Sequence, residues 1–331
     1  MACVVARPDG GRAARDAARE LLARGGADDD PTVAGALPGR VAAVEATLAE
    51  HGWRWVAAGG DGFPARLASV ADPPLGLFVR GEIPGGRAVA LVGARRASAY
   101  GREVGEYLGR ELALAGVAVV SGMARGVDAA AHRGALAAGG PTVAAWGTGP
   151  DRVYPPEHAD LAEEIAGRGC LVTEYPPGTP PLPHHFPERN RIIAGLAEAV
   201  IVVEADERSG ALITARLALD EGREVLAVPG SVFSRLSAGP NGLLRAGAAP
   251  VLSADDVLAA LGLPPRGAAG DAPEPDLVAL IPRGEAVSVD RLAATSGKPV
   301  AEVLERLLVL ELAGQVAREA DGRYRRGPSR A

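Results

Sequence analysis

The chain has 331 residues, of which 47% are hydrophobic and 23% are charged, and its formal net charge is −6. These values are typical of a globular protein, and the length leaves room for two or three domains. The negative charge excludes a global basic field, so a polyanion site would need a local concentration of arginine. Two distant cysteines, Cys3 and Cys170, predict neither a metal site nor a disulfide framework.

Residues 1–80 predict a small N-terminal region that is partly helical and partly irregular. Helical patterns cover Ala13–Ala23 and Arg40–His51, and the irregular segment runs from Gly52 to Gly81, with tryptophans that would pack against the next domain. The N-terminus lacks the pattern of a secretion signal, and no apolar stretch reaches transmembrane length. We therefore expect a cytoplasmic protein with no membrane partner.

Residues 81–261 alternate apolar segments of strand length with helical patterns. The first segment is Ala88–Val92, and the helix after it opens at Ser98. This alternation predicts an α/β fold, an extended Rossmann-like parallel sheet that binds ligands at the carboxyl ends of its strands. The later strands are expected at Val117–Gly122, Pro141–Gly149, Cys170–Pro176, Ala199–Ala205 and Glu224–Gly230, with an apolar run at Ala248–Leu252.

The C-terminal part of the sequence predicts a separate small domain. Residues 262–275 are rich in glycine, alanine and proline and form a linker, and residues 276–326 have the pattern of a winged-helix domain, with three helices and a β-hairpin. The expected recognition helix, Pro299–Leu312, carries three glutamates and one arginine. Because this charge repels a phosphate backbone, a partner-docking or stabilising role is favoured over reading of a major groove.

The loops at the expected strand ends share small residues, arginines and hydroxyl groups. Small residues let backbone amides approach an anion, and guanidinium groups bind phosphate in bidentate fashion. We expect them to form a row of phosphate contacts. The candidates are Gly93, Arg95, Arg96, Ser98, Ser121, Gly122, Arg125, Gly126, Arg189, Asn190, Arg191, Ser209 and Gly210.

Other polar residues are interpreted as structural. Asp128 is expected to cap its helix and His132 to be packed or hydrogen-bonded. Glu174 and Glu204 end strands and could form an acid–base pair, but a structural role is favoured. His184 and His185 lack spaced partners, so they are expected to be loop residues rather than metal ligands. No catalytic residue, metal or cofactor is predicted.

Two phosphate-binding motifs are absent from the sequence. The first strand is followed by VGARRAS instead of a G-x-G-x-x-G dinucleotide fingerprint. The only lysine, Lys298, has no preceding strand of the Walker type, which excludes ATP hydrolysis of that class.

Six segments occur in an order that is similar to one known family: VGARRASAYG, SGMARGVDAAAH, GTGPDRVYPPEH, HFPERNRIIAGL, VVEADERSGALITARLALDEGREVLAVPGS and GPNGLLRAGA. Together they resemble the DNA-processing protein DprA (Smf) family over roughly Gly52 to Leu261. The resemblance implies a protein that binds single-stranded DNA, forms a homodimer and loads RecA onto incoming strands during natural transformation. It also implies a protein that is not an enzyme.

The resemblance assigns roles to individual positions. Gly93 and Arg95 match the family's glycine-x-arginine phosphate pocket, and Asn241 joins the other strand-end candidates as a matching position. The sequence departs from the family at Trp146 and Pro150, and these changes would reshape one wall of the pocket.

Single strands held without sequence preference need a positive groove and aromatic stacking platforms. The available platforms are Tyr154, Tyr175, Phe186 and Phe233. Two other functions stay open. A nucleotide-processing enzyme related to the lysine-decarboxylase-like phosphoribohydrolases would need P-G-G-x-G-T-x-x-E, whereas Pro84-Gly85-Gly86 is followed by RAVA. A duplex DNA regulator would act through the winged helix.

Overall fold

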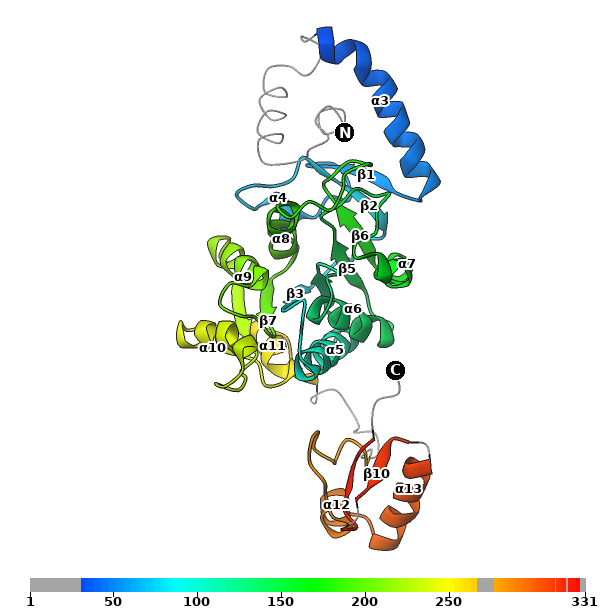
Figure 1. Ribbon diagram of the computed structural model, residues 1–331, viewed down its shortest axis with the longest axis vertical. Coiled ribbons are helices and arrows are strands. Elements are labelled where there is room, and N and C mark those ends of the chain that lie inside the picture. The colour runs from blue at the N-terminus through cyan, green and yellow to red at the C-terminus, as the bar shows by residue number, and fades with distance from the viewer. Residues whose placement is uncertain (1–30, 267–276, 313, 320, 328–331) are drawn as a thin grey trace. The chain divides into compact units, whose positions relative to one another are not determined.

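The computed structural model describes residues 31–266, 277–312, 314–319 and 321–327 (Figure 1). The predicted helix at Ala13–Ala23 lies outside the described residues. The chain divides into two compact units, Met1–Pro265 and Arg266–Ala331. Among the described residues, no helix is long and apolar enough to cross a membrane.

A nine-stranded sheet forms the centre of the first unit, with the order β1-β2-β6-β5-β4-β3-β7-β8-β9. Strands β3 to β9 are parallel, and β1 and β2 are antiparallel additions at one edge. The strands are β1 (Arg54–Ala57), β2 (Gly76–Gly81), β3 (Ala88–Val92), β4 (Ala118–Ser121), β5 (Thr142–Ala145), β6 (Cys170–Thr173), β7 (Ala199–Val202), β8 (Glu224–Ala227) and β9 (Ala249–Pro250).

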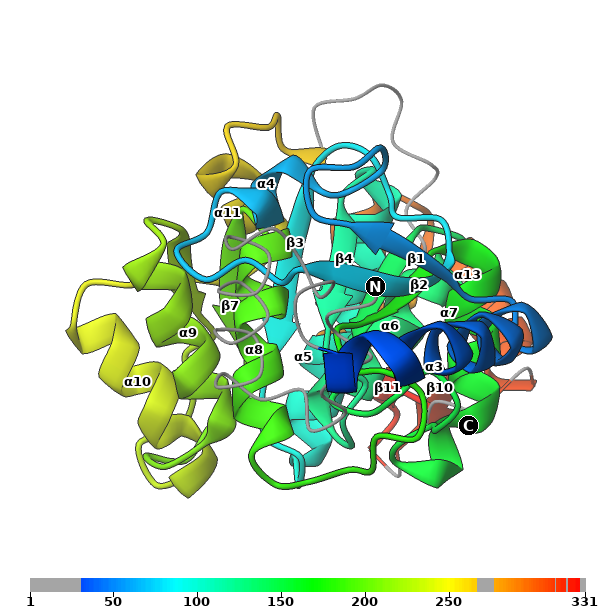
Figure 2. The same cartoon turned by 90° about the horizontal axis from the view of Figure 1, so that it is seen from above.

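Helices cover both faces of this sheet, as Figure 1 and Figure 2 show. Alternate residues of each strand point to opposite faces, so Val89 and Leu91 pack with α5 and α6, while Ala90 and Val92 pack with α8 and α9. The helices of this unit are α3 (Pro31–Glu50), α4 (Ala65–Ala68), α5 (Ala99–Leu114), α6 (Val127–Ala137), α7 (Ala159–Arg168), α8 (His185–Leu196), α9 (Gly210–Asp220), α10 (Ala238–Arg245) and α11 (Ala254–Ala260). The predicted extended Rossmann-like sheet is confirmed.

The segment predicted to be irregular, Gly52–Gly81, contributes β1 and β2 to the sheet. Strand β2 pairs antiparallel with β6, and its Leu77, Phe78 and Val79 are fully buried. The apolar run of β2 is short, and its burial on both faces comes from β6 and from helices elsewhere in the chain. The local sequence pattern therefore did not reveal this strand. Trp53 packs against Trp146, with ring centroids 5.4 Å apart, as expected for a tryptophan that meets the next domain.

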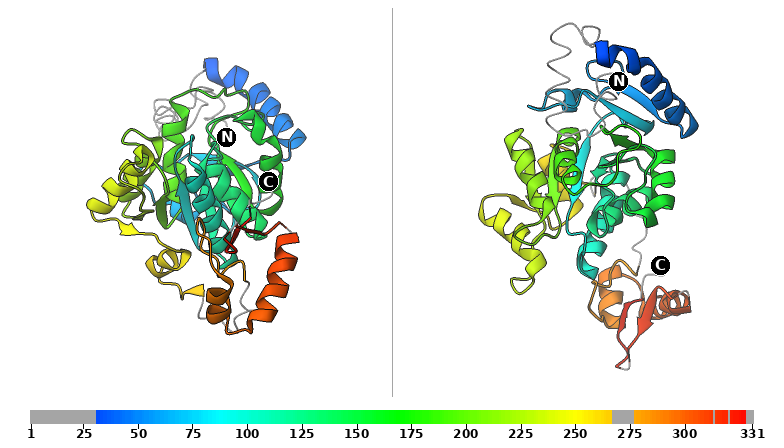
Figure 3. Two further views of the ribbon diagram at one scale, coloured as in Figure 1. Left: turned by 60° about the horizontal axis from the view of Figure 1, so that its bottom comes forward. Right: turned by 45° about the horizontal axis from the view of Figure 1, so that its top comes forward.

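The second unit has the hairpin and two of the helices that the winged-helix pattern predicted (Figure 3). Helix α12 (Val289–Ser296) and helix α13 (Val300–Leu312) pack around Val303 and Leu307, and β10 (Val316–Arg318) pairs with β11 (Tyr324–Arg326). Val287 forms a single β-bridge with Tyr324, and the next residue, Ser288, caps α12. The first expected helix is absent from residue 277 onward, where the chain forms turns.

The close contact between α5 and α6 yields a stability prediction. A Cβ atom at Gly134 would lie 2.0 Å from the Glu106 carbonyl oxygen, so Gly134→Ala must push the two helix backbones apart. We expect a loss of about 1–3 kcal/mol in the free energy of unfolding, measured by urea denaturation. The control is Gly167→Ala on α7, where a Cβ has open space and alanine should stabilise by about 0.5–1 kcal/mol. Equal effects of the two variants would contradict this packing.

Candidate nucleic-acid interface

The carboxyl ends of β3 and β7 flank the point where the direction of strand addition reverses. Strand β3 pairs with β4 on one side and with β7 on the other, and ligands of open α/β sheets bind in the crevice at such a switch point. Gly93 follows β3 here. A Cβ at this position would lie 2.5 Å from Val127 Cγ2, so glycine lets the turn approach α6.

A carboxylate of the protein itself fills the α5 side of this crevice. Glu204, at the end of β7, accepts hydrogen bonds from Ser98 N (2.9 Å) and Ser98 Oγ (2.6 Å). Ser98 also caps α5 by accepting from Gly101 N at 3.1 Å. The N-terminus of α5, where an external anion would otherwise be favoured, is therefore engaged within the protein, and Glu204 has the structural role that the sequence favoured.

The N-terminus of α6 has no side-chain cap hydrogen bond, so the prediction that Asp128 caps this helix is wrong, and Asp128 instead holds the loop before it. Gly126 precedes the helix with φ of +81°, and a Cβ there would lie 2.2 Å from the Ala94 carbonyl oxygen. In the first turn, Asp128 accepts hydrogen bonds from Gly122 N (3.1 Å) and Ala124 N (3.4 Å). Burial raises the pKa of the Asp128 carboxyl, and the nearby Arg189 opposes that rise.

Arg189 of α8 lies beneath the rim rather than on it. Its side chain is 97% buried and donates to the carbonyl oxygens of Gly122 (3.0 Å) and Ala145. Burial lowers the pKa of its guanidinium to about 10, which Asp128 opposes. Arg189 thus joins the ends of β4 and β5 and balances the charge of Asp128.

Arg95 lies above this buried pair and is exposed to solvent. Its Cζ atom is 4.9 Å from the centroid of the Phe186 ring, and that ring packs against Tyr154 at 5.3 Å. A guanidinium over an aromatic face gains cation–π attraction while its N–H groups stay available for an anion. The cavity beneath is about 20 Å³, room for roughly one water molecule; it is lined by Arg95, Gly122, Ala124, Arg125, Tyr154, Pro155, Phe186 and Arg189.

Two further arginines extend this positive surface. Arg96 is exposed and makes no ion pair with another described residue. Arg125 pairs with Glu157, and this hydrogen bond raises the pKa of Arg125 and lowers that of Glu157. Since both side chains are about half exposed, the pair is weak and a phosphate could replace Glu157. We call Arg95, Arg96, Arg125, Tyr154 and Phe186 the rim cluster.

The remaining candidates make contacts within the protein. Ser121 donates to the Leu91 carbonyl oxygen at 2.6 Å and is buried. Asn190 donates to the Gly210 carbonyl oxygen at 3.2 Å, while Ser209 caps α9 by accepting from Ala211 N. Gly210 itself is exposed, with open space where a Cβ would lie. These residues shape the loops, and their DNA contacts stay predictions.

Two candidates lie apart from the rim cluster. Arg191 contacts Glu174 and the carbonyl oxygen of Asp72, so it joins α8 to the N-terminal segment and explains the buried Glu174 carboxylate. Asn241 accepts from Gly230 N at 3.2 Å and donates to the Gly230 carbonyl oxygen at 3.0 Å. It fixes the loop after β8.

Trp146 and Pro150, the two residues that depart from the family pattern, are buried, and so is His185. Trp146 is buried against Trp53 rather than lining the small cavity, and Pro150 is buried as well. His185, expected in a loop, is instead the first residue of α8; it is buried and stacks on Tyr175 at 4.2 Å. The part of the chain that the structure describes contains no cluster of three or more residues suited to a metal ion.

His132 is a buried neutral imidazole. Thr142 Oγ1 donates its proton to the Val119 carbonyl oxygen, so His132 Nδ1, 2.7 Å away, must be the donor to Thr142. Burial lowers the pKa of His132 to about 3. The prediction of a packed, hydrogen-bonded histidine is confirmed.

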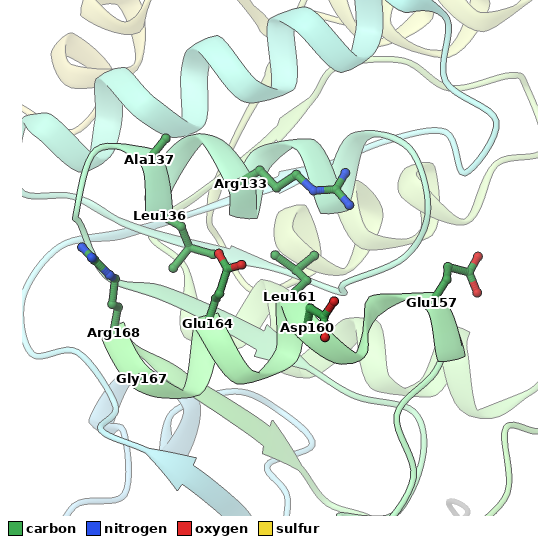
Figure 4. A pocket seen from close by; sticks show the side chains of 9 residues that line it. All are labelled: Arg133, Leu136, Ala137, Glu157, Asp160, Leu161, Glu164, Gly167 and Arg168. Carbon is green, nitrogen blue, oxygen red and sulfur yellow. The ribbon is translucent and has the colours of Figure 1, made fainter. Parts of the chain in front are cut away.

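A larger hollow of about 700 Å³ lies between α6 and α7 (Figure 4). Its walls carry carboxylates of Glu157, Asp160 and Glu164 and the guanidinium groups of Arg133 and Arg168, so charges of both signs face it. It contains none of the predicted site residues. Of the residues that line it, Glu157 forms the ion pair with Arg125 of the rim cluster. Glu157 was not predicted as a site residue from the sequence.

The fold and these contacts define a class of protein: a doubly wound α/β domain with exposed arginines at its strand ends, followed by a winged helix. Residues 54–262 match the family model described as DNA recombination-mediator protein A, and residues 263–322 match the DprA winged helix domain. The chain therefore belongs to the DprA family, as the resemblance implied.

Known relatives agree with this assignment. The chain is 40% identical to Protein Smf of Escherichia coli, covering 80% of this chain and 75% of that protein, and 42% identical to DNA processing protein DprA of Bacillus subtilis, covering 65% and 73%. Among solved structures, DprA of Streptococcus pneumoniae has a TM-score of 0.60 at 40% identity, covering 70% of this chain and 82% of that one. DNA processing protein A of Helicobacter pylori, whose structure concerns its single-stranded DNA binding mode, has a TM-score of 0.57 at 30% identity, covering 63% and 95%.

His132 predicts a pH dependence of stability. Its folded pKa of about 3 lies below the ordinary value of 6.5, so the unfolded chain binds the proton first. Its contribution is fully present above about pH 6.5 and falls by about 1.4 kcal/mol per unit as the pH drops toward 3. His132→Asn keeps a donor for Thr142 but removes this titration. We expect a smaller decline in its free energy of unfolding between pH 6.5 and 4.5; the same decline in both proteins would contradict a buried neutral imidazole.

The buried and exposed arginines should differ in their effect on stability. Arg189→Met leaves the Asp128 carboxylate without its cation and two carbonyl oxygens without their donor, so we expect a loss of about 3–5 kcal/mol. Arg95→Ala removes an exposed side chain and should cost less than about 1 kcal/mol. Chemical denaturation measures both. A small loss for Arg189→Met would show that the buried pair is not needed.

Proposed function

We propose that this chain binds single-stranded DNA without sequence preference at the rim cluster, and that it acts as a recombination mediator that loads RecA during natural transformation. The observation that carries the proposal is the exposed Arg95 guanidinium, held over the Phe186 ring at the switch point of the sheet. The Helicobacter pylori relative binds single-stranded DNA, which supports the choice of ligand.

Charge and stacking at the rim cluster favour a flexible polyanion. Arg95, Arg96 and Arg125 supply positive charge, while Tyr154 and Phe186 supply half-exposed aromatic surface. Single-strand binding without sequence readout combines these two elements. Because the chain's net charge is −6, the attraction for phosphate groups comes from the arginines of the rim cluster. Binding should therefore depend strongly on these few arginines and on salt concentration.

We propose a binding rather than a catalytic role for the rim. A pocket that encloses a small substrate occupies about 300–1,000 Å³, whereas the cavity below Arg95 is about 20 Å³. The two strand-end glutamates are engaged, Glu204 by Ser98 and Glu174 by Arg191. These contacts support a binding protein over the alternative of a phosphoribohydrolase.

The winged helix enters the proposal as a partner-docking or stabilising element. Its α13 carries Glu302, Glu305 and Glu311 on exposed or half-exposed positions, and Lys298 is paired with Glu302. This charge disfavours insertion into a major groove. A homodimer and a RecA contact belong to the same proposal and rest on membership of the family.

Arg95→Ala should weaken binding of a labelled oligothymidine while leaving the melting temperature nearly unchanged. Removing one phosphate contact should reduce the slope of log K against log salt by about 0.7 in magnitude. Fluorescence anisotropy across a salt series measures both affinity and slope. A matched control is Arg168→Ala, an exposed arginine at the end of α7, just before the amino end of β6 and away from the carboxyl ends of the strands. Equal affinity and slope for wild type and Arg95→Ala would remove the phosphate pocket from the proposal.

A further inference from the structure

We propose that Phe233, in the loop after β8, is a second base-stacking platform that extends the single-stranded DNA site across the β7–β8 side of the sheet. This inference rests on the proposed function. The ligand is the same polyanion, and the added element is an unpaired base that stacks on the ring. The strand path would thus run past the switch point instead of ending at the rim cluster.

The exposure of Phe233 is the first observation. Its side chain is 96% exposed and that of the preceding Val232 is 84% exposed, the two highest values among the large hydrophobic residues that the structure describes. The other aromatic candidates differ from it: Tyr175 is fully buried, and Tyr154 and Phe186 pack against each other. Phe233 is therefore the candidate platform with a whole ring face open to a base.

The loop that presents Phe233 is held at its base. Asn241 makes two hydrogen bonds to Gly230, and a Cβ at Gly230 would lie 2.2 Å from Ser237 Oγ, so the loop packs tightly there. Within the loop, Ser231 Oγ accepts from Phe233 N (3.3 Å) and the Ser231 carbonyl oxygen accepts from Ser234 N (3.0 Å). A fixed loop loses little conformational entropy when a base stacks on its tip.

The loop is continuous with the switch point that holds the rim cluster. Strands β3, β7 and β8 are adjacent and parallel, so their carboxyl ends lie side by side, about 10 Å apart from first to third. Tyr100, in the first turn of α5, donates to the Pro229 carbonyl oxygen at 3.1 Å. The segment after the loop bonds to Ala205 beyond the end of β7: Ala205 N donates to the Leu236 carbonyl oxygen at 2.7 Å.

The charges beside this loop favour a base contact over another phosphate contact. Arg208, in the loop after β7, and Arg235, in the loop after β8, are exposed. Asp206 and Glu207 lie beside Arg208 and offset this positive charge. Phosphate attraction is therefore weaker here than at Arg95 and Arg96. An aromatic face serves any base, because every base has a π-surface, and so it lengthens the site without adding sequence preference.

The test compares Phe233→Ala, Phe233→Leu and Phe233→Trp with wild type. Anisotropy measures binding of oligothymidine and of an oligonucleotide of equal length with consecutive abasic sites. We expect Phe233→Ala and Phe233→Leu to bind oligothymidine about 5-fold to 10-fold more weakly, near the lower limit for one base–aromatic stack. Their affinity for the abasic strand and their salt slope should match wild type. Leu308→Ala, an exposed leucine of the winged-helix unit, should change nothing.

Phe233→Trp supplies a positive readout. It should retain affinity, and oligothymidine should quench its fluorescence more than that of wild type, whose Trp53 and Trp146 are buried and whose half-buried Trp55 lies on β1, at the other edge of the sheet from β8. Because Phe233 is exposed, all three variants should keep the wild-type melting temperature.

Two outcomes would overturn the inference. One is wild-type affinity of Phe233→Ala for oligothymidine, which leaves the proposed function standing. The other is a change of oligomeric state in sedimentation with unchanged DNA affinity, which would make Phe233 a contact between copies of this chain. Failure of wild type itself to bind oligothymidine would instead contradict the proposed function.

Discussion

The Glu204 carboxylate joins the two halves of the sheet across the switch point. By accepting from Ser98 N and Oγ, it links the end of β7 to the start of α5, and Gly101 is required because a Cβ there would lie 2.2 Å from Glu204 Oε2. Asp128 holds the loop before α6 by accepting from Gly122 N and Ala124 N. The N-terminus of α5, a usual anion site of such folds, is engaged within the protein by Glu204. The exposed side chains of Arg95 and Arg96 remain available to an anion at this edge of the sheet.

This arrangement divides the arginines into two groups with different physical roles. Arg189 is buried and Arg191 is half-buried, and both bond to carbonyl oxygens or carboxylates of the strand ends and loops around them, so they hold the loops in position. Arg95 and Arg96 are exposed on the loop after β3, which the buried contacts hold in place. In the proposed function, a rim built in this way holds a polyanion at its surface without enclosing it. Such a site suits a long, flexible strand better than a small metabolite.

Much of the architecture followed from local pattern. Short apolar segments that alternate with helical patterns predicted the parallel strands β3 to β8, because strands buried on both faces must be continuously apolar. The hydrophobic period also predicted α5, α12 and α13. The edge strands β1 and β2 were missed since their burial comes from partners distant in sequence: Phe78 faces Thr173, almost a hundred residues later. The sequence likewise placed Arg95 at a strand end and identified the family.

What the sequence determined by itself was therefore the order of elements, the family and the residues gathered at one edge of the sheet. Only the tertiary structure decided which of those residues are available to a ligand. Arg189 and Arg95 look alike in sequence, yet one is buried under the rim and the other lies on it. Tyr175 and Phe233 differ in the same way. The physical reason is that burial and hydrogen-bond partners of a side chain depend on segments folded against it from elsewhere in the chain, whereas a local pattern records only periodicity and turn chemistry.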